Sequence, residues 1–315
     1  MMACFREVKV VFAIGIDIGG TSVKGMTLLQ DKIVDEYRYP TNASAGKEAI
    51  LYALQKVIDH LLKSVPATKV IGIGVGSAGM INRTTGVVEY ATSNLPGWQG
   101  FNIKKWIEKR YRIYAEIDND ANVALLGEIS LNKKIKREEI IHAMMITLGT
   151  GVGGANLFFG QLLHGRHYQS GEWGHVILVP DGKQCNCGKK GCIEQYISGT
   201  ALLREANRVS NNTYSHGSEI FKQANKDQRL QKIITRYLHY LALVIGNIST
   251  GLDPDILFLG GGVIESHPYW WDDLLHILKE NKTNIYVEPA RHLNKAGMYG
   301  AAQLVLKKGE FDEIS

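Results

Sequence analysis

Three of the four cysteines in this 315-residue chain fall within eight consecutive positions, 185–192, and His175 precedes them. Three thiolates and one imidazole form the closed four-ligand set of a structural zinc site. Gly188 and Gly191 permit the tight reversals that bring nearby ligands onto one ion. A disulfide is the alternative interpretation, but it would leave one of the three thiols over. We therefore predict a structural zinc site with the ligands His175, Cys185, Cys187 and Cys192.

Two short glycine turns suggest a second kind of chemistry. Residues 19–21 read Gly-Gly-Thr after the apolar segment 8–17, and residues 149–151 read Gly-Thr-Gly after the apolar segment 140–148. Without a Cβ, such turns let backbone N–H groups approach phosphate oxygens closely. Either turn alone is more simply a hairpin that needs glycine, and neither matches the Walker or dinucleotide pattern. Their shared strand–glycine–threonine plan suggests duplicated halves that close on one ligand.

Aspartates near these turns are candidates for phosphoryl transfer. Asp17 ends the first predicted strand and could bind Mg²⁺, which takes one or two carboxylates; capping a turn is the alternative. Asp118 and Asp120 precede a predicted helix at 121–131. They could cap that helix, or a carboxylate there could accept the proton of a hydroxyl that attacks the γ-phosphate. The residues alone leave these alternatives open.

The order of these motifs resembles that of the ROK family (repressors, open reading frames and kinases). The family pattern of His, nine residues and then Cys-x-Cys-Gly-x-x-Gly-Cys-x-Glu is present in full at 175–194. Further segments resemble the family's first phosphate motif, sugar segment, catalytic segment, second phosphate loop and adenosine loop. In that order they are residues 17–24, 94–98, 119–122, 148–154 and 260–262. The resemblance spans nearly the whole chain.

This resemblance implies an ATP- and Mg²⁺-dependent sugar kinase with a structural Zn²⁺ and with Asp120 as the catalytic base. His175 would bind zinc through one ring nitrogen and face a sugar hydroxyl with the other. The other substrate-binding residues would be Ser77, Gly79, Asn94, Asn119, Glu172 and Glu194. The residues that bind ATP or Mg²⁺ would be Asp17, Gly19, Gly20, Thr21, Thr150, Gly151, Gly261 and Gly262. A homodimer is also implied.

Two signals disagree about the sugar. Family members that act on glucose usually show Gly-x-Pro-Gly where this chain has Gly-Ser-Ala-Gly at 76–79, which looks more like the N-acetylmannosamine kinases. Residues 94–98, Asn-Leu-Pro-Gly-Trp, are typical of glucokinase-like members. We expect phosphorylation of the 6-hydroxyl of N-acetylmannosamine or glucose. Ala78 in place of a stiff proline favours tolerance of the bulkier N-acyl hexosamine.

The alternative function is a sugar-responsive regulator or a non-catalytic sugar sensor, because the family also contains repressors and a fold alone does not define an activity. The repressors carry a helix-turn-helix ahead of the first glycine motif. Here the residues ahead of Asp17 are predicted to form a strand, and both Asp120 and the two phosphate turns are present. These features favour an enzyme.

Alternating strand and helix patterns predict an α/β fold. Strands are expected at 8–17, 22–30, 69–76, 112–117, 140–148, 155–159 and 255–259. Helices are expected at 46–64, 101–111, 121–131, 228–250 and 297–306. The family resemblance implies the actin-like ATPase (ribonuclease-H-like) fold, with two domains around a catalytic cleft. The expected domains are residues 1–120 with 298–315, and residues 121–297, which include the zinc site.

Composition is that of an ordinary globular protein, with 45% hydrophobic and 21% charged residues. A formal net charge of +5 is modest and spread along the chain, so we expect no nucleic-acid partner. The basic run at 133–137 is followed at once by two glutamates, as in a solvated surface segment. We expect no membrane span, no signal peptide and a cytoplasmic location, where the cysteines stay reduced.

Overall fold

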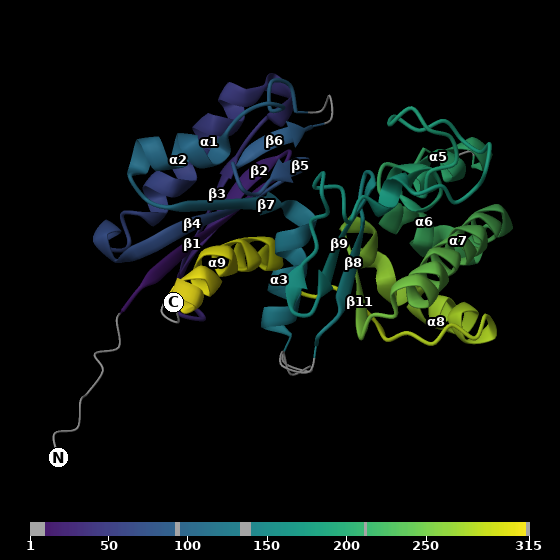
Figure 1. Ribbon diagram of the computed structural model, residues 1–315. Coiled ribbons are helices and arrows are strands. Elements are labelled where there is room, and N and C mark those ends of the chain that lie inside the picture. Colours follow the sequence, from purple (N-terminus) through teal and green to yellow (C-terminus); the bar gives the residue numbers. More distant parts are fainter. Residues whose placement is uncertain (1–9, 92–94, 133–139, 211–212, 313–315) are drawn as a thin grey trace, which may run out of the picture. The chain divides into compact units, whose positions relative to one another are not determined.

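The computed structural model describes residues 10–91, 95–132, 140–210 and 213–312 (Figure 1). The chain separates into two compact units, Met1–Leu131 with Asn294–Ser315, and Asn132–Leu293. We expected the boundaries at 120 and 298. They differ because α3 (Asp120–Leu131) packs within the first unit. A Cβ on its Gly127 would collide with the backbone of Ala296 in α9 (Leu293–Asp312), so the two helices are in direct contact.

The first unit is built on a five-stranded sheet with the order β3-β2-β1-β4-β7. Strands β1, β4 and β7 are parallel, whereas β2 is antiparallel to both β1 and β3. The central strands are buried, while the edge strand β3 is mostly exposed and rich in charge, which discourages pairing with other chains. The bounds are β1 Phe12–Ile18, β2 Ser22–Leu29, β3 Lys32–Pro40, β4 Val70–Ser77 and β7 Ala115–Asn119. A separate hairpin pairs β5 (Met80–Asn82) with β6 (Val87–Tyr90).

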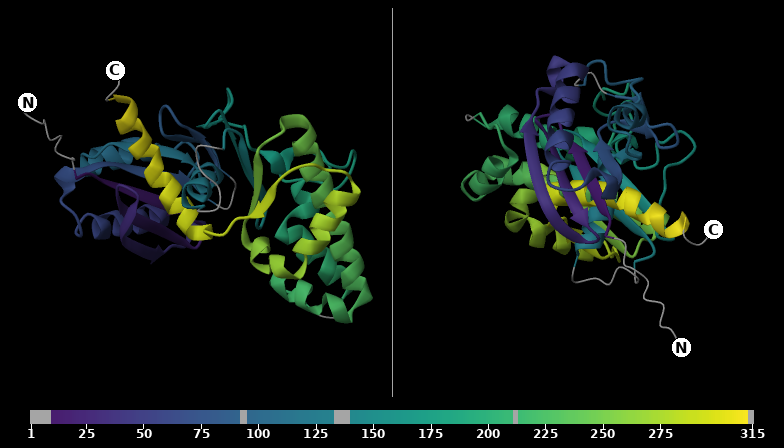
Figure 2. Two further views of the ribbon diagram at one scale, coloured as in Figure 1. Left: turned by 90° about the horizontal axis from the view of Figure 1, so that it is seen from below. Right: turned by 90° about the vertical axis from the view of Figure 1, so that its left-hand side faces the viewer.

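Helices cover this first sheet. The apolar face of α1 (Lys47–Leu61) is buried, and the Asn102 side chain caps α2 (Ile103–Tyr111) by accepting a hydrogen bond from the Lys105 amide. α9 lies along the sheet, beside its purple strands in both views of Figure 2. Cβ atoms on Gly15 or Gly74 would collide with backbone carbonyls of α9, so glycine is what permits this close packing.

The second unit repeats the strand plan of the first. Its five-stranded sheet has the order β10-β9-β8-β11-β12, with β9 antiparallel to β8 and β10 and with β8, β11 and β12 parallel. β8 therefore corresponds to β1, and β9 to β2. The bounds are β8 Ala143–Leu148, β9 Val152–Phe158, β10 Gln161–Leu162, β11 Ile256–Gly260 and β12 Val287–Pro289. The matching order and direction are what the predicted duplication of the two halves requires.

A large apolar core joins the second sheet to its helices. The longest helix, α7, contributes ten buried residues to it, and Trp270 and Phe221 stack within it. The helices are α4 Glu194–Ile197, α5 Gly199–Val209, α6 Gly217–Gln223, α7 Gln228–Leu252 and α8 Trp271–Glu280. The segment between β10 and α4, which contains the cysteine cluster, has little regular structure.

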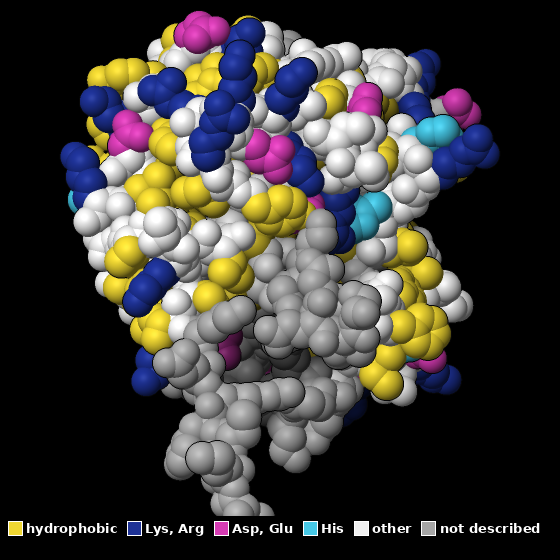
Figure 3. Space-filling model, turned by 60° about the vertical axis from the view of Figure 1, so that its left-hand side comes forward, with side chains coloured by type: hydrophobic (Ala, Val, Ile, Leu, Met, Phe, Trp, Pro, Cys, Tyr) yellow, Lys and Arg dark blue, Asp and Glu magenta, His cyan; other side chains and the backbone are white. Residues whose placement is uncertain are grey.

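Most predicted elements are confirmed to within a few residues. Expected strand 155–159 begins at Val152 and expected helix 297–306 begins at Leu293. The expectation missed β3, the β5–β6 hairpin, β10, β12 and the helices α4, α5, α6 and α8. Within the described ranges, no helix combines the length and apolar character needed to cross a membrane. On the face in Figure 3, Lys and Arg side chains lie among acidic and apolar ones.

Candidate active site and metal centre

Three neighbouring parallel strands of the first unit end at the same edge with polar residues. Parallel register places Ile18 beside Ser77, and Ser77 beside Asn119, so the carboxyl ends of β1, β4 and β7 meet. In open α/β sheets, ligands bind at this edge. Asp17 lies one residue before the end of β1, and Asp120 begins α3 directly after β7.

Asp17 and Asp120 interact electrostatically. Burial, and then the charge of Asp120, raise the pKa of Asp17 from 3.8 to about 6, while Lys24 lowers it. Burial also raises the pKa of Asp120. Two half-buried carboxyl groups, of which Asp17 also interacts with Lys24, fit a divalent cation, because hard cations favour carboxylate oxygens. A raised pKa also makes Asp120 a stronger proton acceptor at neutral pH.

The turn between β7 and α3 distinguishes the roles of its aspartates. The buried Asp118 accepts hydrogen bonds from the Asn119 amide and from Nδ2 of Asn122, at 2.7 Å each. Asp118 therefore holds the turn. The Ala121 amide donates to Oδ1 of both Asn119 and Asp120, at 2.8 and 2.9 Å. Asp120 is thereby oriented by the helix start and stays partly accessible, as a proton acceptor must be.

The predicted sugar-binding residues of this unit have structural partners. Ser77 is fully buried, and its Oγ accepts a hydrogen bond of 3.0 Å from Nε1 of Trp98. Nδ2 of Asn119 donates to the Gly79 carbonyl at 3.0 Å, which ties two of the predicted segments together. Gly79 has φ +106° and a Cβ there would collide with the Tyr90 carbonyl. Asn94 lies outside the described residues.

The first glycine turn, residues 19–21, connects β1 to β2. The Gly19 amide donates to the Ser22 carbonyl at 3.0 Å, and the carbonyls of Gly20 and Thr21 accept from the next loop. A Cβ on Gly20 would have no neighbour within 4 Å. Gly20 and Thr21 are exposed. The turn thus leaves space beside Gly20 for a ligand.

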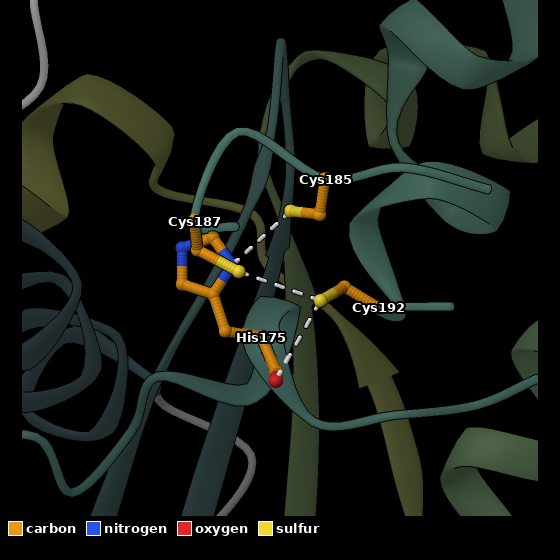
Figure 4. Close-up of side chains that lie close together, drawn as sticks. All are labelled: His175, Cys185, Cys187 and Cys192. Atoms are coloured by element: carbon orange, nitrogen blue, oxygen red, sulfur yellow. Dashed lines mark hydrogen bonds between the residues drawn. The ribbon is translucent and has the colours of Figure 1, made fainter. Parts of the chain in front are cut away.

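In the second unit, four side chains point toward one centre (Figure 4). They are His175, Cys185, Cys187 and Cys192, whose ligand atoms lie within 4.8 Å of one another. Sγ of Cys185 is 3.6 Å from Nδ1 of His175, and Sγ of Cys187 is 3.6 Å from Sγ of Cys192. The cysteines are not disulfide-bonded.

These separations fit a tetrahedral zinc ion. Bond lengths of about 2.3 Å to sulfur and about 2.05 Å to nitrogen place ligand atoms about 3.8 Å (S to S) and about 3.6 Å (S to N) apart. The two observed distances of 3.6 Å are close to both values. Nδ1 of His175 would bind the ion, and Nε2 lies 4.0 Å from the Glu172 carboxylate. Nδ1 therefore faces the cysteines, and Nε2 faces Glu172.

Backbone contacts shape the cysteine loop. Gly188 and Gly191 have φ +89° and +81°, which favour glycine, and a Cβ on Gly191 would collide with the Val179 carbonyl. Short bridges pair Ile177 with Cys192 and Gln184 with Lys190. Backbone contacts therefore help to bring the ligands close together.

The turn that holds Glu172 and His175 lies directly on β9. A Cβ on Gly174 would collide with the Val152 carbonyl, and one on Gly154 would come within 2.7 Å of the Trp173 ring. Nε1 of Trp173 donates to Oδ1 of Asn156 on β9 at 2.9 Å. β9, the strand that follows the second glycine turn, therefore supports the turn that holds Glu172 and His175.

The second glycine turn, residues 149–151, lies beside the third glycine segment. A Cβ on Gly261, at φ +85°, would collide with the backbone of Leu148, which precedes the turn. The Gly199 amide, at the start of α5, donates to the Gly149 carbonyl at 2.7 Å. Gly262 has open space at its Cβ position. The structure thus brings together the predicted ATP-binding glycines of this unit.

Sequence reasoning missed two contacts of these sites. Gly297 of α9 approaches Asp17 so closely that its Cβ would lie 3.1 Å from the carboxyl carbon. Gly199 supports the second glycine turn. Gly297 was included only as the start of a predicted helix, and Gly199 was in no prediction. Gly297 and Gly199 each lie close to a residue that is distant in sequence, and local sequence patterns do not reveal such contacts.

Comparisons with known proteins agree with this architecture. A family model described as the ROK family matches residues 13–308. Glucokinase from Halalkalibacterium halodurans is 32% identical over 286 residues, covering 85% of this chain and 84% of that enzyme. N-acetyl-D-glucosamine kinase from Escherichia coli O1:K1 is 30% identical over 307 residues, covering 93% and 98%.

The fold is also similar to that of a solved structure. The ROK family glucokinase from Streptomyces griseus, in complex with glucose and AMPPNP, has a TM-score of 0.77 and 26% identity, covering 94% of this chain and 99% of that one. The chain belongs to the ROK family. Its α/β structure is the actin-like ATPase fold that ROK sugar kinases share.

Proposed function

We propose that this protein is an ATP-dependent kinase that phosphorylates the 6-hydroxyl of a hexose or N-acyl hexosamine. The observation that carries the proposal is the pair of carboxyl groups at one sheet edge, with Asp120 partly buried at the start of α3 and its pKa raised. A sugar hydroxyl is a weak nucleophile, so a nearby carboxylate must accept its proton as the γ-phosphate is attacked. Asp120 takes that role.

The remaining residues position the reactants. Asp17 would hold Mg²⁺, which neutralises phosphate charge during transfer. The glycine turns at 19–21 and 149–151, with Gly261 and Gly262, would present backbone N–H groups to the nucleotide. Asn94, Asn119, Glu172, His175 and Glu194 would bind the ring hydroxyls, since amides, carboxylates and imidazole suit them. Ser77 would contribute indirectly, by holding Trp98.

Zinc would be bound by the Cys₃His set and would have a structural role. Nδ1 of His175 faces Cys185 and Nε2 faces Glu172, so zinc bound at Nδ1 would keep Nε2 available to the sugar. The closed set leaves no coordination position for the sugar. The four ligand atoms lie within 4.8 Å of one another, and the S–N and S–S distances of 3.6 Å are close to tetrahedral values, which supports this assignment.

The identity of the preferred sugar is best tested by comparing candidate sugars directly. Relatives include both a glucokinase and an N-acetyl-D-glucosamine kinase. Ala78 in place of the proline typical of glucose-specific members favours tolerance of an acetamido group. We therefore propose N-acetylmannosamine over glucose as the preferred substrate.

A coupled assay of ADP release with glucose, N-acetylmannosamine, N-acetylglucosamine and fructose tests both the kinase activity and the preferred sugar. We expect the highest kcat/KM with N-acetylmannosamine. A kcat/KM for glucose that is tenfold higher than for N-acetylmannosamine would make the protein a glucokinase. If no sugar is phosphorylated yet sugars bind, the protein is the regulator or sensor of the alternative hypothesis.

A further inference from the structure

The Glu194 carboxylate lies between two predicted sites of the second unit. Its Oε1 lies 3.2 Å from Sγ of Cys185. Its Oε2 lies only 2.8 Å from where a Cβ on Gly151 would be. Glu194 is the first residue of α4 and is partly accessible. Its carboxyl group is therefore bounded by a metal-site residue on one side and by the second glycine turn on the other.

Gly149 in the same turn provides the contrast. A Cβ on Gly149 would meet no heavy atom within 4 Å. Neither Gly149 nor Gly151 has a positive φ, so the backbone accepts alanine at both positions. At Gly151 the contact at 2.8 Å is with the end of a flexible side chain, so an added methyl group would displace the carboxylate rather than the backbone.

We infer that Gly151 is a positioning residue for Glu194. Its missing side chain allows the carboxylate to lie against the turn and beside Cys185. The inference rests on the proposed role of Glu194 in sugar binding. It goes beyond that role because it makes the affinity for sugar depend on a residue of the nucleotide turn even when no nucleotide is bound.

The test compares Gly151→Ala with Gly149→Ala by calorimetric titration of sugar in the absence of nucleotide. The sugar is the one that binds the wild-type protein most tightly. In Gly151→Ala we expect the dissociation constant to rise about tenfold or more, the size expected for loss of one hydrogen bond to a charged group. In Gly149→Ala it should change less than about twofold, because that Cβ would meet nothing.

A double-mutant cycle with Glu194→Ala isolates the coupling. Once Glu194 is removed, Gly151→Ala should have no further effect on the dissociation constant. An equal loss in both backgrounds, or unchanged affinity in Gly151→Ala, would overturn the inference. Zinc content and thermal midpoint of each variant should match the wild type, because the backbone is not displaced.

A crystal structure of Gly151→Ala provides a test that does not depend on sugar binding. We expect that Oε1 of Glu194 no longer contacts Cys185, or that the carboxylate has rotated away from residue 151. An unmoved carboxylate would refute the inference. If the wild type binds no sugar but the carboxylate moves, the proposed function fails while the steric role of Gly151 stands.

Discussion

The two units share one strand plan but hold their candidate functional groups in different ways. In the first unit, Asp17 and Asp120 lie at the end of a strand and the start of a helix, and α9 packs on the same sheet through glycine contacts. In the second unit, His175 lies in a segment with little regular structure between β10 and α4, and Glu194 begins α4 directly after it. Close backbone contacts hold that segment, which also carries the Cys₃His cluster.

This difference shows two solutions to one problem. Carboxyl groups at the ends of core elements are positioned by packing, and the accompanying burial raises the pKa of both aspartates. The loop of the second unit has little regular structure, and a zinc ion bound by the Cys₃His set would add a cross-link to its packing contacts, as structural zinc sites do. The first solution should resist local perturbation, and the second should depend on a single ion.

The largest effect should come from Asp120→Asn. The change is nearly isosteric and removes only the proton acceptor, so kcat should fall on the order of 10²–10⁴-fold while sugar and ATP still bind. Steady-state kinetics with calorimetric titration of both substrates measures this. A near-normal kcat would show that the carboxyl pair of the first unit is not the catalytic one.

Loss of zinc should have the next largest effect and should be confined to the second unit. In Cys187→Ser, or after chelation, we expect the sugar dissociation constant to rise roughly 10–100-fold, because His175 and Glu194 lose their anchor. Hydrogen exchange should accelerate at 172–194 but not in β1 and β7. Metal analysis should find about one zinc per wild-type chain. Full sugar affinity in metal-free protein would contradict the contrast between the units.

The buried Asp17 should make the first unit less stable as pH rises. Its folded-state pKa of about 6 exceeds the ordinary 3.8, so the folded state binds the proton more tightly. The associated stability is fully present below about pH 4 and is lost as pH rises through about 6. Asp17→Asn should therefore match the wild type near pH 4 and exceed its unfolding free energy at pH 7 by at most about 3 kcal/mol.

Denaturant unfolding without nucleotide or Mg²⁺ at several pH values measures this difference. If the difference in unfolding free energy between Asp17→Asn and wild type is constant from pH 4 to 7, packing does not raise the pKa of this carboxyl group. Nucleotide affinity should fall in the same variant, which separates the functional role of Asp17 from its energetic cost.

The smallest effect should follow Gly297→Ala. An added Cβ would lie 3.1–3.4 Å from the Asp17 carboxyl atoms, so that side chain must shift by only a few tenths of an ångström. We expect a few-fold rise in KM for MgATP with little change in kcat, since small misplacements cost less than full ones. Gly251→Ala, whose Cβ would meet nothing within 4 Å, is the matched control. An equal rise in KM for MgATP in both variants would show that α9 does not position Asp17.

Several features of the site followed from local sequence. The grouping of His175 with the three cysteines is predicted from the sequence because a cysteine cluster and its glycines act over a short stretch of chain. The strands before each glycine turn were predicted for the same reason, since β-branched runs and turn residues act on their immediate neighbours. Strands β3 and β12 and helix α5 were missed because their form depends on the elements that they pair with or pack against.

By itself, the sequence determined which chemical groups are available and in what order: the Cys₃His set, the glycine turns and the aspartates at 17 and 120. Only the tertiary structure decided which of these groups interact. It committed the Ser77 hydroxyl to Trp98, placed Gly297 against Asp17, and set Glu194 between Cys185 and Gly151. The physical reason is that these contacts, apart from that between Glu194 and Cys185, join residues distant in the chain. Such contacts depend on the packing of whole elements rather than on local conformational preference.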